Sequence, residues 1–168
     1  MGSDITFFLS TGTAYCTGRG EVLTSQPPVG PGTPVTICKP NVGLSTPTVF
    51  KSLNYDLLRN DLEPEDLLDD FIKTGVVDAT SYINDLEPPA FANLPELKAL
   101  KEELLEVDGF SHVLMSGSGT SIFGIGQPVD KEAFQEKFGS RQDLQVFFAE
   151  FINRPDEDTW YEKPSSMM

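Results

Sequence analysis

Two short apolar runs in the second half of the chain enclose a segment made only of serine, glycine and threonine. Val113–Met115 precedes this segment and Ile122–Ile125 follows it. Runs of this length, bounded by turn residues, are typical of buried strands. The pattern therefore predicts a hairpin whose tight turn is formed by residues 116–121.

The spacing of apolar and polar positions predicts the remaining elements. We expect two short strands around a glycine turn within 11–23, a strand at 35–38, a strand or short helix at 144–152, and helices at 4–10, 45–53, 62–72, 95–106 and 131–138. Residues 84–91 are rich in turn formers and lead into the 95–106 helix, which we expect to bury Leu97, Leu100, Leu104 and Leu105. Strands separated by helices, with one internal hairpin, indicate an α+β fold, in which helices cover one face of an antiparallel sheet.

A proline- and glycine-rich break at residues 26–34 separates a short first part from the rest. We predict that residues 1–33 are the end of a domain whose beginning is absent. Residues 34–155 then form the second domain, and 156–168 a loose tail.

The charge of the chain restricts its partners. It has 168 residues and a formal net charge of −14, from 26 acidic and 12 basic side chains. This balance argues against nucleic acid and against anionic membrane surfaces, and no apolar run reaches the roughly 18 residues of a transmembrane helix. Two cysteines are too few for a disulfide framework, which favours a reducing compartment. A bound phosphate must therefore be held locally, by backbone amides or a metal.

The predicted hairpin turn is the first candidate for such a site. Gly117 and Gly119 tolerate positive φ, which lets neighbouring N–H groups point into one concavity that suits an anion. The alternative is a turn that needs glycine only for its backbone. The segment lacks both the lysine of a P-loop and the third glycine of a dinucleotide fingerprint, so the turn alone leaves both interpretations open.

Four stretches together carry a family resemblance: residues 2–8, 12–21, 39–47 and 115–120. In this order the chain resembles the later part of the GHMP small-molecule kinases. Residues 15–21, 84–91 and 153–161 are similar to a plant, plastid-type branch. The family's lysine motif and its glycine-rich phosphate loop have no match, so the resemblance implies that an N-terminal half of the same enzyme is missing.

The resemblance implies a ferredoxin-like second domain and a function. That function is ATP-dependent phosphorylation of the 2-hydroxyl of 4-diphosphocytidyl-2-C-methyl-D-erythritol, in the non-mevalonate isoprenoid pathway. It also implies Mg²⁺ with the ATP, although no ligands can be assigned, and a plastid location. The expected partners are thus the two small molecules and the absent half. Two alternatives stay open: an inactive truncated product, and a non-catalytic binding module derived from this domain.

The resemblance also assigns roles to individual residues. Asp4 matches the catalytic aspartate, which would accept the proton of the attacking alcohol, although Thr6 stands where the family usually has proline. Phe50 matches the aromatic residue that stacks on cytosine, unless it only packs the helix face, and Thr46 lines the same pocket, unless it only caps its helix. The nucleotide site is expected at Gly117, Ser118, Gly119 and Thr120. His112 has no metal-ligating neighbour in the sequence, and we expect no special role for it.

Overall fold

The computed structural model describes residues 6–10, 12–28, 30, 32–59, 63–74 and 82–152. Its main sheet has four antiparallel strands in the spatial order β4-β5-β3-β6. These strands are β3 (Pro34–Pro40), β4 (Phe110–Met115), β5 (Ile122–Gly126) and β6 (Leu144–Glu150). The first strand of this sheet, β3, lies inside it and pairs with the last strand, β6, which lies at one edge. This is the strand order of the ferredoxin-like fold. The predicted α+β class and the predicted β4–β5 hairpin are confirmed.

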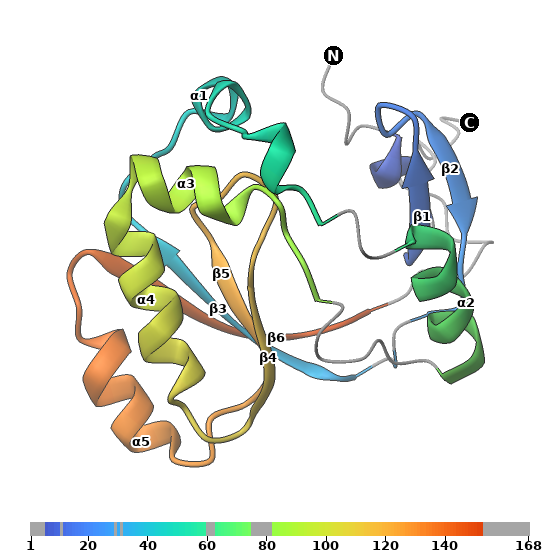
Figure 1. Ribbon diagram of the computed structural model, residues 1–168. Helices are drawn as coiled ribbons and strands as arrows, with labels where there is room; N and C mark the ends of the chain where they lie inside the picture. The colour runs from blue at the N-terminus through green and yellow to red at the C-terminus, as the bar shows by residue number, and fades with distance from the viewer. Residues whose placement is uncertain are drawn as a thin grey trace, which may run out of the picture.

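Helices cover one face of this sheet, as expected (Figure 1). They are α1 (Thr46–Lys51), α3 (Glu87–Asn93), α4 (Pro95–Leu105) and α5 (Lys131–Phe134), which continues as a π-helical turn at Gln135–Gly139. The prediction of a turn-rich entry at 84–91 was incomplete, because most of this stretch is α3. Pro88 and Pro89 stand at its first positions, where a missing N–H costs no helical hydrogen bond.

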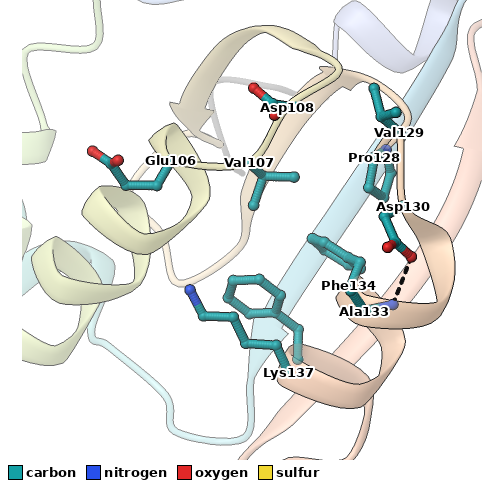
Figure 2. Close-up of a pocket in the computed structure, with 10 residues that line it drawn as sticks. Glu106, Val107, Asp108, Pro128, Val129, Asp130, Ala133, Phe134 and Lys137 are labelled. Carbon is teal, nitrogen blue, oxygen red and sulfur yellow. Dashed lines mark hydrogen bonds between the residues drawn. The ribbon is translucent and has the colours of Figure 1, made fainter.

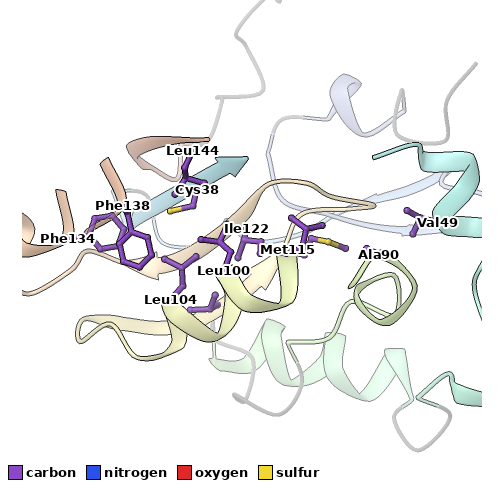
Figure 3. Packing of buried hydrophobic residues seen from close by; sticks show 12 residues of the cluster. Cys38, Val49, Ala90, Leu100, Leu104, Met115, Ile122, Phe134, Phe138 and Leu144 are labelled. Atoms are coloured by element: carbon purple, nitrogen blue, oxygen red, sulfur yellow. The ribbon is translucent and has the colours of Figure 1, made fainter. Parts of the chain in front are cut away.

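The core lies between the sheet and these helices (Figure 3). Leu97, Leu100 and Leu104 are at most 2% exposed and share one face of α4. Leu105 is 58% exposed, so its predicted burial was wrong. It follows Leu104 by one position, and a turn of about 100° carries it to the solvent side.

The first part of the chain forms a separate two-stranded ribbon. Strands β1 (Ala14–Thr17) and β2 (Val22–Ser25) pair antiparallel around a glycine turn, as predicted. Helix α2 (Pro64–Thr74) lies beside this ribbon (Figure 1), and a cavity of about 270 Å³ separates their apolar side chains. On α2, the side chains of Leu67, Leu68 and Phe71 line this cavity, whereas Ile72 is 47% exposed.

Two short 3₁₀ turns complete the described elements, at Phe7–Leu9 and Tyr55–Leu57. The predicted helix at 4–10 is reduced in the described residues to the first of these turns. The predicted strand or helix at 144–152 is the strand β6. No helix in the described segments is long and apolar enough to cross a membrane.

Candidate functional site

The loop that joins β4 to β5 has the backbone that its glycines predict. Gly117 has φ +53° and Gly119 has φ +88°, both in the region that favours glycine. The amide of Gly119 donates to the carbonyl of Ser116 at 2.9 Å, which closes the turn. That amide is therefore not available to an anion, in contrast to the expected row of free N–H groups. The amides of Gly117, Ser118 and Thr120 make no hydrogen bond within the described part of the chain.

Helix α1 brings a second predicted element to this loop. The hydroxyl groups of Thr46 and Ser118 are 2.8 Å apart, although the two residues lie 72 positions apart in the sequence. Thr46 does not act as the helix cap that was its alternative role, because it is the first residue of α1. The N-cap residue is Ser45, and its side chain makes no capping bond. The Thr46 hydroxyl joins α1 to the loop between β4 and β5, residues 116–121, which we call the glycine loop.

Phe50 lies one helical turn after Thr46, so both side chains project from the same side of α1. Phe50 is 51% exposed, whereas its neighbour Val49 is fully buried and anchors the helix in the core. At this exposure the ring of Phe50 is accessible to a ligand, on the same side of α1 as the Thr46 hydroxyl.

Thr120 holds the far end of the loop in place. It is 3% exposed, and its hydroxyl donates to the carbonyl of Val42 at 3.0 Å. The same oxygen accepts a hydrogen bond from the ammonium of Lys39 at 2.9 Å. Lys39 also donates to the carbonyl of Pro40 at 3.3 Å, and its third N–H donor has no partner among the described residues. Sequence reasoning did not place this lysine at the loop, where it brings a positive charge to a strongly acidic chain.

Three more residues that sequence reasoning missed hold the near end of the loop. The side-chain amide of Asn84 donates to the carbonyls of Met115 at 2.8 Å and Gly117 at 2.7 Å. Glu87 accepts a hydrogen bond from the backbone N–H of Met115 at 2.9 Å, and its other oxygen lies 2.6 Å from the ammonium of Lys101. The spacing Asn84-x-x-Glu87 resembles a helix capping box and was the available signal.

Two predicted or considered residues lie elsewhere. Asp4, the expected catalytic base, lies outside the described residues. His112 stands on β4 and stacks on Tyr82, with ring centroids 4.0 Å apart. Within the described segments no group of three or more histidine, cysteine, aspartate or glutamate side chains could hold a metal ion. These segments therefore assign no Mg²⁺ ligands.

Shifted pKa values occur at β3 and at the start of β6. Burial raises the pKa of the Cys38 thiol to about 12, although Arg141 opposes the shift. A hydrogen bond from Arg141 lowers the pKa of the exposed Asp143 carboxyl, and the same bond raises the pKa of Arg141. A buried thiol that stays protonated is a structural group and not a nucleophile.

A cavity of about 260 Å³ lies at the opposite end of the β4–β5 hairpin (Figure 2). Its walls come from residues 106–108, just before β4, from residues 128–130, just after β5, and from α5. The aromatic side chains of Phe134 and Phe138 are among the residues that line it. The glycine loop joins the other ends of the two strands, so this cavity is separate from the site described above.

Comparison with known proteins gives consistent results. Residues 68–143 match the family model described as GHMP kinases C terminal. The chain is 40% identical over 171 residues to the chloroplastic 4-diphosphocytidyl-2-C-methyl-D-erythritol kinase of Arabidopsis thaliana. This alignment covers 99% of the present chain and 43% of that protein. It is 43% identical over 161 residues to the 4-diphosphocytidyl-2-C-methyl-D-erythritol kinase of Protochlamydia amoebophila. This alignment covers 96% of the present chain and 48% of that relative. The chain thus spans less than half the length of these relatives.

Solved structures show the same relationship. A crystal structure of 4-(cytidine 5'-diphospho)-2C-methyl-D-erythritol kinase superimposes with a TM-score of 0.67 at 29% identity, over 89% of this chain and 53% of that one. A homoserine kinase from Cytophaga hutchinsonii superimposes with a TM-score of 0.54 at 16% identity, over 79% of this chain and 45% of that one. The second match supports the fold alone.

Proposed function

We propose that this chain, of which residues 68–143 match the GHMP kinases C terminal model, supplies the substrate-binding part of an ATP-dependent kinase. The substrate is 4-diphosphocytidyl-2-C-methyl-D-erythritol, phosphorylated on its 2-hydroxyl in non-mevalonate isoprenoid biosynthesis. One observation carries the proposal: the 2.8 Å contact between Thr46 and Ser118, which sets the exposed Phe50 beside the glycine loop.

In this proposal Phe50 stacks on the cytosine ring of the substrate. Stacking of a base on an aromatic side chain contributes roughly 1–3 kcal/mol in nucleic-acid proteins. The hydroxyls of Thr46 and Ser118 offer neutral hydrogen bonds next to the ring. The resemblance implies that residues 117–120 belong to the nucleotide site. Because the loop contacts Thr46, we instead assign the amides of Gly117, Ser118 and Thr120, which have no partner among the described residues, to the phosphate oxygens of the substrate.

Phosphoryl transfer then needs a base and a donor nucleotide. The substrate oxygen forms a bond to the γ-phosphorus of ATP as the bond to the bridging oxygen breaks, and ADP leaves. We assign to Asp4 the proton that the 2-hydroxyl loses. A Mg²⁺ ion bound with ATP would neutralise phosphate charge when present, but no step is assigned to it.

The net charge of −14 limits what the chain can do by itself. Catalysis of phosphoryl transfer depends mainly on positioning and on the stabilisation of charge around the phosphates. The chain contains no counterpart of the family's phosphate loop or lysine motif, and Lys39 is one cation against a large negative field. We therefore expect the 168-residue chain alone to have no detectable turnover.

Because the named plant relatives are chloroplastic, we also propose a plastid location.

A chimera tests the proposed function. The chain replaces the matched segment of the Arabidopsis thaliana relative, and ADP release is measured with and without 4-diphosphocytidyl-2-C-methyl-D-erythritol. The proposal predicts substrate-dependent turnover in the chimera and none in the chain alone. A folded chimera that binds the substrate but transfers no phosphate would contradict it, and would favour the alternative of a non-catalytic binding module.

A further inference from the structure

A network of three side chains holds the near end of the glycine loop, and neither the family resemblance nor the comparisons assign it a role. It consists of Asn84, just before α3, Glu87, in the first turn of α3, and Lys101, on α4. We propose that Asn84 and Glu87 are positioning residues for phosphate binding: they hold the loop so that its unpaired amides can bind the diphosphate of the substrate. This inference rests on the proposed function.

The contacts of Asn84 explain how it would act. Its amide nitrogen donates to the carbonyls of Met115 and Gly117, on either side of Ser116. Both carbonyls are thereby turned toward Asn84, and each is an acceptor that would repel a phosphate. The adjacent amide of Ser118 belongs to the same peptide unit as the Gly117 carbonyl. Because the two groups of a peptide unit point in opposite directions, fixing this carbonyl also fixes the direction of the Ser118 N–H.

Glu87 holds the strand residue that precedes the loop. Its carboxylate accepts the backbone N–H of Met115, and the Met115 side chain is 1% exposed in the core. Lys101 lies 2.6 Å from the second carboxylate oxygen, and the two side chains are only 19% and 13% exposed. The ion pair keeps Glu87 in one orientation. Backbone on both sides of Ser116 is therefore tied to the start of α3.

A different role is possible for Asn84, because its side-chain oxygen also accepts the N–H of Leu86 at 2.9 Å. That bond belongs to a local turn that leads into α3. Serine can make the same turn through its hydroxyl but has no amide to reach the two carbonyls. The substitution Asn84→Ser therefore separates the turn from the contacts with the loop, and it adds no charge.

The test compares two probes, cytidine and cytidine 5'-diphosphate (CDP), by titration of the 168-residue chain followed by NMR. For Asn84→Ser the inference predicts about tenfold weaker binding of CDP and unchanged binding of cytidine. Asn54→Ser is the matched control. Asn54 accepts the same kind of turn bond, from the N–H of Asp56 at 3.0 Å, and makes no hydrogen bond to the loop in the described part of the chain, so Asn54→Ser should change neither affinity.

Amide hydrogen exchange gives a second measurement. Asn84→Ser should speed exchange of the Gly119 amide, and Glu87→Gln should speed exchange of the Met115 amide. Exchange in β3 and β6 should stay unchanged in both variants. The control for Glu87→Gln is Glu102→Gln, which removes one partner of an exposed ion pair on α4. Equal losses of cytidine and CDP affinity, or faster exchange confined to α3, would overturn the inference. Wild-type chain that binds neither probe would overturn the proposed function and this inference with it. Unchanged CDP affinity in Asn84→Ser would overturn the inference alone.

Discussion

Replacing Gly119 or Gly117 by alanine separates two causes of lost stability in the glycine loop, namely backbone strain at positive φ and overpacking of the core. Both residues have positive φ, where a Cβ atom costs about 1–2 kcal/mol. At Gly117 an added Cβ meets nothing within 4 Å, so the backbone cost stands alone. At Gly119 the same atom lies 3.0 Å from the sulfur of Met115 and 3.6 Å from Leu97, both of which are buried. Overpacking of a core adds about 1–3 kcal/mol.

We therefore expect Gly117→Ala to lower the free energy of unfolding by about 1–2 kcal/mol, and Gly119→Ala by about 2–5 kcal/mol. The larger loss at Gly119 comes from Met115, whose buried side chain is part of the core (Figure 3) and lies against this position of the loop. Urea unfolding followed by circular dichroism measures both variants against the wild type. Equal losses for the two variants would refute the packing argument, and no loss for either would refute the assigned backbone conformation.

Three other predictions concern the proposed site and the core. Phe50→Leu should weaken cytidine binding by roughly 1–3 kcal/mol with little change in stability, whereas Tyr55→Leu, at another exposed aromatic residue, should leave binding unchanged in the same titration. In the active chimera, Asp4→Asn should lower kcat by about 10²–10⁴-fold with little change in KM, and full activity would refute its role as the base. The Cys38 thiol, with a pKa raised from 9.0 to about 12, should resist alkylation in the folded chain while the exposed Cys16 reacts. Since the unfolded chain loses the Cys38 proton first, stability should fall between pH 9 and pH 12 by up to about 1.4 kcal/mol per pH unit, and Cys38→Ala should remove this part of the slope.

Local patterns predicted most of the fold. The apolar runs on either side of the glycine loop became β4 and β5, and the spacing of Leu97, Leu100 and Leu104 gave the buried face of α4. The errors also have local causes. Adjacent prolines at 88 and 89 indicate a break in most settings, but at the first positions of a helix they fit, and α3 was missed.

The site could be predicted only in part, because its contacts join distant segments. The resemblance singled out Thr46 and Ser118, yet their contact across 72 positions is visible only in the structure. Asn84 reaches the loop across 33 positions and Lys39 across 81, and neither belongs to a periodic pattern or a motif that points to a phosphate. Asn84 bonds backbone carbonyls, which carry no signature in the sequence, and Lys39 bonds the hydroxyl of a residue 81 positions away, so neither contact with the loop could be placed from the sequence.

The central claim is that α1 and the glycine loop form one binding site for a cytidine diphosphate group. The most direct measurement is an NMR titration of the ¹⁵N-labelled chain with CDP, with ADP as the comparison. The account predicts saturable CDP-dependent shifts at Thr46, Phe50 and residues 117–120, with weaker effects from ADP. Shifts confined to the cavity of Figure 2, or no shifts in a folded chain, would contradict it.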